Sequence, residues 1–194
     1  MRLVSVPHLR RVLASIALAG GLALLPLAAS AADLLDVSYR QLAGKESVNL
    51  AQRYHGRVLL VVNTASKCGF TPQYEGLEAL QKTYSARGLS VLGFPSNDFM
   101  GQEPGDEKDI QEFCTLTYGV KFPMFEKVHV VGDQATPLFK GLTAATGVAP
   151  GWNFHKYLIG RDGAVIAQFP SKVKPDDKSL VAAIERALAA PVTP

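Results

Sequence analysis

The stretch that decides the fold runs from Arg57 to Pro72 and reads RVLLVVNTASKCGFTP. Its first seven residues, Arg57–Asn63, form an apolar and largely β-branched run, which is typical of a strand buried on both faces of a parallel sheet. Thr71 followed by Pro72 predicts an N-cap and the first residue of a helix. We therefore expect a buried strand, a short connection that contains Cys68, and a helix.

Strands and helices alternate along the rest of the chain. Apolar residues recur at helical spacing after the proline, and Gly88 stands where a helix C-cap belongs. The pattern then predicts, in chain order, a strand at Leu89–Asn97, a helix at Asp106–Gly119, a third strand at 122–132, a helix at 136–146, a hairpin at 153–170 that turns at Arg161–Gly163, and a last helix at Ser179–Ala189. This order predicts an α/β protein with a thioredoxin-like fold: a central mixed sheet with flanking helices, parallel in its first strands and antiparallel in its final pair.

The first 31 residues have the composition of an export signal. Arg2, Arg10 and Arg11 precede an apolar run without any acidic residue, and Ala29–Ala31 offers the small residues that a signal peptidase reads. The paired arginines leave a twin-arginine route open, but the general secretion route is favoured. We expect cleavage near residue 31, a single mature domain at 32–194, no membrane anchor, and a periplasmic location.

The charge balance gives no support for a nucleic-acid-binding surface. The full chain has 20 Lys and Arg against 17 Asp and Glu, and removing the three basic residues of the leader leaves 17 against 17. The expected mature chain thus has a net charge near zero, and nothing in it supports the clustered positive charge that a nucleic-acid or membrane surface would need. The histidines His55, His129 and His155 have no paired spacing with cysteine or acidic residues, so we expect neither a metal nor another cofactor.

Only two cysteines are present, Cys68 and Cys114. In an oxidising compartment such a pair forms a structural disulfide by default. Cys68, however, is predicted at the carboxyl end of a buried strand and before a helix, where positive partial charge favours the nucleophilic thiolate. Thr71 stands where a Cys-x-x-Cys motif would have its second cysteine, which weakens a disulfide-exchange function. A lone activated thiol favours attack on a peroxide, with formation of a sulfenic acid.

Four segments of the chain form a distinctive set, namely NTASKCGFTPQYEGLEAL, GFPSNDFMGQEPG, FCTLTYGVKFPMFEKV and WNFHKYLIGRDG. In order and spacing they resemble the glutathione peroxidase family, and the resemblance extends from about Val37 to the C-terminus. It implies the thioredoxin-like fold and places Cys68 at the position of the peroxidatic cysteine. Gln102, Trp152 and Asn153 match the other members of the family's catalytic tetrad. Their neutral N–H donors suit a thiolate and the negative charge that develops on the departing oxygen.

The resemblance also implies a role for Cys114, at the position of the resolving cysteine. It would form a disulfide with oxidised Cys68, which a thioredoxin-like protein or glutathione then opens. A permanent structural disulfide and an inert buried thiol remain as alternatives. We expect Cys114 on an inward stripe with Ile110, Phe113 and Thr117, so that the helix must unravel locally before the two sulfurs meet.

Two features depart from the family pattern. Ser96 and Asp98 stand where the family more often has cysteine and glutamine. Ser96 removes a spare sulfur, and Asp98 brings a negative charge near the site if its side chain points inward. The segment between His129 and Trp152 lacks the longer insertion through which tetrameric members assemble, so we expect a monomer.

The sequence thus predicts an exported peroxidase that reduces hydrogen peroxide or organic hydroperoxides through Cys68 and acts in the response to oxidative stress. The alternative is a non-enzymatic thioredoxin-fold redox sensor or binding module, in which the disulfide is structural or signalling.

Overall fold

The computed structural model describes residues 34–191, so the expected export signal lies outside the described residues. A four-stranded mixed sheet has the strand order β4-β3-β5-β6. Its strands are β3 (Val58–Thr64), β4 (Leu89–Pro95), β5 (Lys156–Ile159) and β6 (Val165–Phe169). β3 and β4 are parallel, whereas β5 is antiparallel to both β3 and β6. The predicted central mixed sheet is therefore confirmed.

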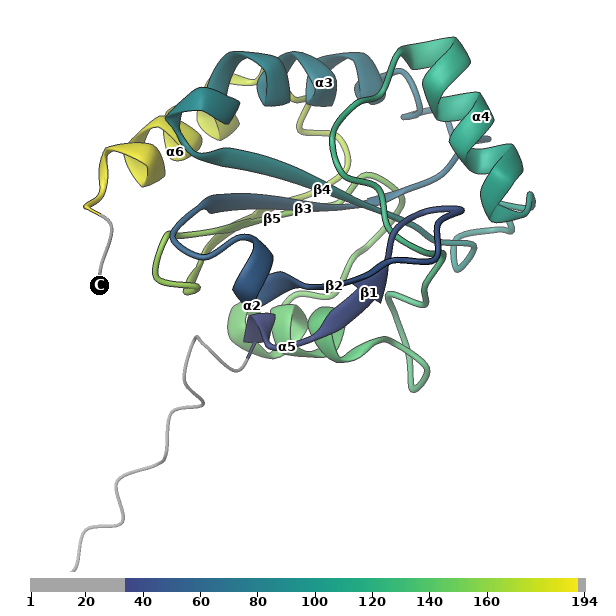
Figure 1. Ribbon diagram of the computed structural model, residues 1–194, viewed down its shortest axis with the longest axis horizontal. Coiled ribbons are helices and arrows are strands. Elements are labelled where there is room, and N and C mark those ends of the chain that lie inside the picture. Colours follow the sequence, from purple (N-terminus) through teal and green to yellow (C-terminus); the bar gives the residue numbers. More distant parts are fainter. Residues whose placement is uncertain (1–33, 192–194) are drawn as a thin grey trace, which may run out of the picture.

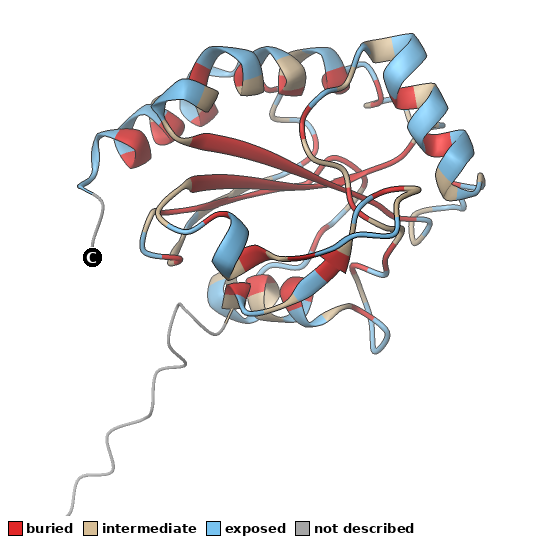
Figure 2. Cartoon of the chain, in the orientation of Figure 1, coloured by how far each residue is buried: buried red, intermediate tan, exposed pale blue. Residues whose placement is uncertain are grey.

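The sheet separates two hydrophobic cores because successive side chains of a strand point to opposite faces. Leu60 and Val62 of β3 belong to one core, and Leu59 and Val61 belong to the other. Every residue of β3 and β4 is buried, as Figure 2 shows by the unbroken red of these strands. This double burial confirms the prediction made from the apolar run.

Helices cover both faces of the sheet (Figure 1). α3 (Gln73–Tyr84) and α6 (Lys178–Ala189) lie over one face, and α5 (Pro137–Thr146) lies under the other together with the short α2 (Leu50–Arg53). α4 (Glu107–Tyr118) lies beside α3 and contributes Ile110 and Cys114 to the first core. None of the helices in residues 34–191 is long and apolar enough to cross a membrane.

The predicted third strand at 122–132 is wrong. This segment makes only isolated bridges, between Phe125 and Gln41 and between Met124 and Gly93. The backbone N–H groups of Phe125 and Val128 donate to the carbonyls of Gly93 and Pro95 in β4. The N–H of Glu126 donates instead to the carbonyl of Arg40. The apolar residues are buried, but the backbone alternates between partners on two elements, so no continuous ladder forms.

The sequence also failed to predict a two-stranded hairpin before the sheet. β1 (Ser38–Arg40) pairs antiparallel with β2 (Ser47–Asn49), and each strand has only three residues. Such short strands contain too few residues for alternation of polar and apolar side chains to be recognised. The hairpin packs Tyr39 and Val48 into the second core.

Two local assignments need correction. Thr71 is not the N-cap of α3, because the helix begins at Gln73 after a cap residue, Pro72, that forms no side-chain hydrogen bond. Thr117 is exposed rather than part of an inward stripe, and the buried positions of α4 end at Cys114. The other predicted helices and the hairpin of β5 and β6 are confirmed to within a few residues.

Candidate active site

Cys68 lies in a loop that follows the carboxyl end of β3 and is held together by Thr71. The Thr71 hydroxyl accepts the N–H of Cys68 at 3.0 Å and donates to the carbonyl of Ala65 at 2.9 Å. The backbone N–H of Phe70 donates to Cys68 Sγ at 3.4 Å. Because α3 starts only at Gln73, this single amide is a nearer donor to the sulfur than the end of the helix. Cys68 is half-buried, so a small molecule can reach it.

The Gln102 loop is fastened to the residues just before Cys68. Lys67 donates its backbone N–H to the carbonyl of Gln102 at 3.0 Å, and Ser66 donates its N–H to Glu103 Oε1 at 3.1 Å. Glu103 is fully buried, and burial raises the pKa of its carboxyl group. The carbonyl of Gln102 and the side chain of Glu103 therefore anchor this loop to the Cys68 loop.

Trp152 and Asn153 lie on a turn before β5 that is tied to the end of β3. The N–H of Phe154 donates to the carbonyl of Asn63 at 2.7 Å, and Asn63 Nδ2 donates to the carbonyl of Trp152 at 3.1 Å. Asn153 Nδ2 donates to Gln102 Oε1 at 2.9 Å. With its oxygen engaged in this way, the Gln102 carboxamide keeps its Nε2 hydrogens for another acceptor.

The indole of Trp152 packs against a second aromatic ring, that of Phe99, with the ring centroids 5.5 Å apart and the planes inclined at 44°. Both rings are half-buried. The next residue, Met100, has 81% of its surface exposed and a left-handed φ of 53°. The Gln102 loop therefore presents an apolar edge beside the Trp152 turn.

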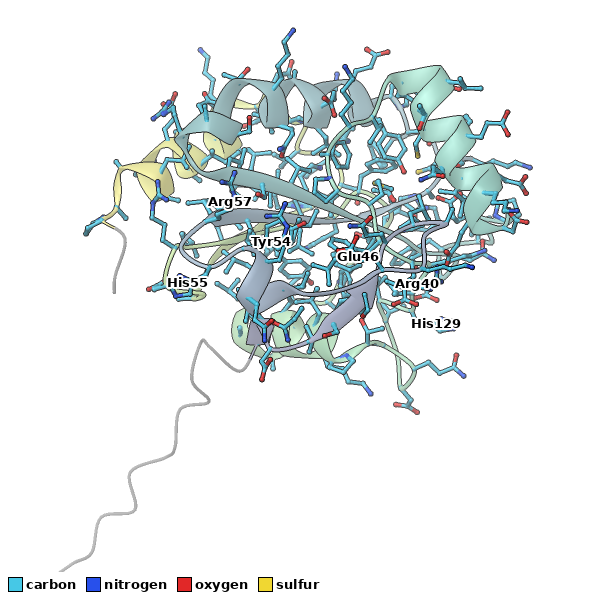
Figure 3. The ribbon with its side chains drawn as sticks, in the orientation of Figure 1. Arg40, Glu46, Tyr54, His55, Arg57 and His129 are labelled. Atoms are coloured by element: carbon cyan, nitrogen blue, oxygen red, sulfur yellow. The ribbon has the colours of Figure 1, made fainter. Side chains whose placement is uncertain are left out.

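Asp98 does not bring a free charge to this site. Burial alone would raise the pKa of its carboxyl group, but hydrogen bonds from the N–H of Val130 (2.6 Å) and from His129 Nδ1 (2.6 Å) outweigh burial and lower it. Figure 3 shows His129 at the edge of the molecule. The charge of Asp98 is thus held toward the segment around Val130. Ser96 is fully buried, and its hydroxyl accepts the N–H of Asp98 at 3.4 Å.

Cys114 lies in the middle of α4 in different surroundings. Its exposed fraction is 1%, and both cysteines are free thiols in this structure. Burial raises the pKa of the Cys114 thiol to about 11. Cys68 and Cys114 contact the same hydrophobic core, although no bond joins them. The Tyr74 ring packs in this core too, and its hydroxyl has no hydrogen-bond partner of ordinary geometry within the described residues.

A groove of about 350 Å³ separates the Cys68 loop from α4. Its lining comes from the two fastened loops and from one side of the helix, namely Ser66, Lys67, Glu103, Pro104, Gly105, Asp109, Ile110 and Phe113. Residues 34–191 contain no group of three or more histidine, cysteine, aspartate or glutamate side chains that could hold a metal ion.

The sequence interpretation missed the residues that hold the site together. Thr71 was assigned to a helix cap, and Asn63, Ser66 and Glu103 received no role. One signal was available: Asn63 and Thr64 are polar residues at the end of a fully buried apolar strand, where an uncompensated polar group is costly. Such residues are expected to bind other loops at that end of the sheet.

Comparison with known proteins identifies the family. The sequence model of the glutathione peroxidase family matches residues 34–143. A glutathione peroxidase of Lactococcus lactis is 52% identical over 136 residues, which cover 68% of this chain and 86% of that protein. The thioredoxin/glutathione peroxidase BtuE of Escherichia coli is 45% identical, with coverage of 73% and 91%. The hydroperoxy fatty acid reductase gpx1 of Synechocystis is 50% identical, with coverage of 70% and 85%.

Solved structures agree with this assignment. The crystal structure of Trgpx in apo form is 37% identical and superposes with a TM-score of 0.66, covering 84% of this chain and 98% of that one. A thiol:disulfide interchange protein of the thioredoxin family from Chlorobium tepidum has a TM-score of 0.55 at 20% identity. That second likeness shows the thioredoxin-like fold.

Proposed function

Because the chain belongs to the glutathione peroxidase family and is a thiol-dependent peroxidase, we propose that Cys68 is the residue that attacks the peroxide. The observation that carries this proposal is the setting of its sulfur. Cys68 Sγ is half-exposed, receives the Phe70 N–H, and sits on a loop hydrogen-bonded to Gln102. Cys114, the other thiol of the chain, is buried and has a raised pKa, which makes it a poor first nucleophile.

The reaction begins with attack of the Cys68 thiolate on the terminal peroxide oxygen. The O–O bond breaks, Cys68 becomes a sulfenic acid, and the departing alkoxide or hydroxide takes a proton to leave as alcohol or water. Gln102 Nε2, Asn153 and the Trp152 indole N–H stabilise the thiolate and the departing oxygen. The hydrogen bond from Asn153 to Gln102 Oε1 supports this assignment because it orients the Gln102 donor group.

Cys114 resolves the sulfenic acid in the second step. Its thiol displaces water from oxidised Cys68 to form a disulfide, which two electrons from a dithiol reductant then reopen. α4 has to open locally first, since Cys114 is buried. Two features support opening. On the C-terminal side of Phe113, Cys114 is the one buried residue of α4, so little apolar contact holds this part of the helix. A groove also already separates α4 from the Cys68 loop.

The second thiol and the relatives support a choice of reductant and substrate. A thioredoxin-like dithiol protein is the preferred reductant, with glutathione as the alternative, because a disulfide formed within the chain matches dithiol exchange. Organic hydroperoxides are included among the substrates, given the 50% identity to a hydroperoxy fatty acid reductase. We also propose that the chain is exported to the periplasm and acts as a monomer of residues 32–194, on the strength of the leader-like first 31 residues and the short segment before Trp152.

The first experiment measures peroxide consumption by the mature protein supplied with glutathione or with a reduced dithiol protein. Cys68→Ser should lose activity by at least about a thousandfold, whereas Cys114→Ser should retain one fast turnover and lose recycling by the dithiol protein. Mass spectrometry after one equivalent of peroxide should show a disulfide in the wild type and a sulfenic acid in Cys114→Ser. Unchanged turnover in Cys68→Ser would overturn the proposal.

The second experiment tests the donors. Gln102→Ala and Asn153→Ala should each slow Cys68 oxidation by on the order of a hundredfold, the scale expected for loss of one oriented donor. Gln111→Ala is a matched control, because its side chain donates only to the carbonyl of Leu42 on the hairpin side of α4. Rates for the two donor variants equal to that of the control would remove these residues from the mechanism.

A further inference from the structure

Lys156 is a buried lysine for which the peroxidase proposal has no role. Its side chain on β5 is fully buried, and it takes part in none of the ion pairs formed among residues 34–191. Its Nζ donates one hydrogen bond, to the carbonyl of Phe154 at 2.7 Å. Burying an amine without a counter-charge is costly. A lysine kept under these conditions is therefore a candidate functional residue.

The carbonyl that Lys156 binds belongs to a residue with an unusual backbone. Phe154 has a φ of 64°, in the left-handed region that residues other than glycine rarely adopt. Its N–H is tied to the carbonyl of Asn63 at 2.7 Å. Lys156 binds the carbonyl of the same residue, so both the N–H and the carbonyl of Phe154 have a hydrogen-bond partner.

This turn carries two of the proposed catalytic residues. Asn63 Nδ2 binds the carbonyl of Trp152, and Asn153 Nδ2 binds Gln102 Oε1. If Phe154 relaxed to a right-handed or extended conformation, the peptide before it would rotate and carry the Asn153 side chain away from Gln102.

We propose that Lys156 is a positioning residue of the peroxidase, whose ammonium group holds the Phe154 carbonyl and thereby keeps Trp152 and Asn153 beside Gln102. The inference rests on the proposed catalytic site. Lys156 does not touch substrate; it acts through the turn. A charged donor binds a carbonyl more strongly than a neutral amine does, so protonation of Lys156 tightens the turn.

The charge of Lys156 changes in the neutral range. Burial lowers the pKa of its amine to about 7. In the described part of the chain, the titratable group coupled to it is the neighbouring His155, whose own pKa is lowered to about 4, first by burial and then by the charge of Lys156. His155 is therefore neutral between pH 6 and 8.5 and does not contribute to a change in that window.

Trp152 offers a direct readout because it is the only tryptophan of the chain. The fluorescence of the reduced wild type should change with a midpoint near pH 7, and the change should be absent in Lys156→Met. The exposed Lys82→Met is the matched control and should behave as the wild type. Stopped-flow oxidation of Cys68 by hydrogen peroxide should be at least about tenfold slower in Lys156→Met at pH 6, and the difference should shrink several-fold by pH 8.5. Lys156→Arg, which stays charged, should keep most of the rate throughout.

Two results would overturn the inference. One is wild-type fluorescence that is flat from pH 6 to 8.5. The other is a ratio of wild-type to Lys156→Met rates that is unity or constant over this range, because a loss independent of pH means packing alone. If circular dichroism shows Lys156→Met to be unfolded, the inference is tested instead by the fluorescence titration of the wild type and by the rate of Cys68 oxidation in Lys156→Arg. If peroxide leaves Cys68 of the wild type unoxidised, the peroxidase proposal is refuted instead. The fluorescence titration would still test whether Lys156 holds the turn that carries Trp152.

Discussion

The two cysteines pack against the same core, yet they differ in exposure and in the groups around their sulfur atoms. Cys68 is half-exposed on a loop whose amide points at its sulfur, whereas Cys114 is 1% exposed within a helix and its thiol pKa is raised to about 11. The residue type is the same, so the difference in reactivity comes from burial and from the local donors. One fold thus leaves one thiol accessible and encloses the other in a helix.

The largest expected effect is on alkylation. At pH 7.5 a thiol with a pKa of about 11 is ionised to only about one part in several thousand, and burial also blocks the reagent. Iodoacetamide should therefore modify Cys68 at least about a hundredfold faster than Cys114 in the reduced native protein, as followed by peptide mass.

Denaturant provides the control for this prediction. In guanidinium chloride concentrated enough to unfold the chain, the two rates should become similar. Equal rates in the native protein would remove the contrast between the two thiols.

An intermediate effect is expected on hydrogen exchange in α4. Formation of the disulfide from Cys68 to Cys114 should raise exchange at the amides of Glu107–Tyr118 by about tenfold or more, because the helix has to unwind for the sulfurs to meet. α6, also a helix of 12 residues, serves as the internal reference and should exchange alike in both forms. Equal protection of α4 in reduced and oxidised protein would rule out unravelling.

The smallest effects concern the stability of α4 itself. Asp106 caps the helix by accepting the N–H groups of Lys108 and Asp109, and Asp106→Ala should cost about 1 kcal/mol. Disulfide formation should then become faster by about fivefold. Thr115→Ala, at an exposed site, should improve helix propensity by about 0.5 kcal/mol and slow the same step by about twofold.

These two variants control each other because their predicted effects have opposite signs. Cys68 oxidation, measured before the disulfide forms, should be the same in both. Disulfide formation that responds to neither change, or to both in the same direction, would mean that opening of α4 does not limit the step.

Sequence patterns predicted the parts of the fold that depend on long periodic segments. The buried strand at Arg57–Asn63 and the hairpin that turns at Arg161–Gly163 were recognised because each repeats its signal over several residues. The segment at 122–132 has the apolar alternation of a strand but forms none, since its backbone partners come from two different elements. Alternation reports which side chains are buried, and it does not report whether a neighbouring strand is available.

The same distinction applies to the candidate site. Cys68 could be singled out from its position in the pattern, whereas the roles of Cys114, Gln102, Trp152 and Asn153 came from a family resemblance. The interactions that hold these residues join segments far apart in the chain, such as Asn63 with Trp152, and no local pattern encodes them.

The sequence alone determined that a thiol would lie at the carboxyl end of a doubly buried strand, because burial and strand direction follow from the order of apolar residues. Only the tertiary structure decided which groups surround that thiol. It assigned Thr71 to the Cys68 loop, turned Asp98 toward His129, and placed Lys156 under the Phe154 carbonyl. Hydrogen bonds and desolvation depend on distances in space, and these arise only when the two layers of helices pack against the sheet.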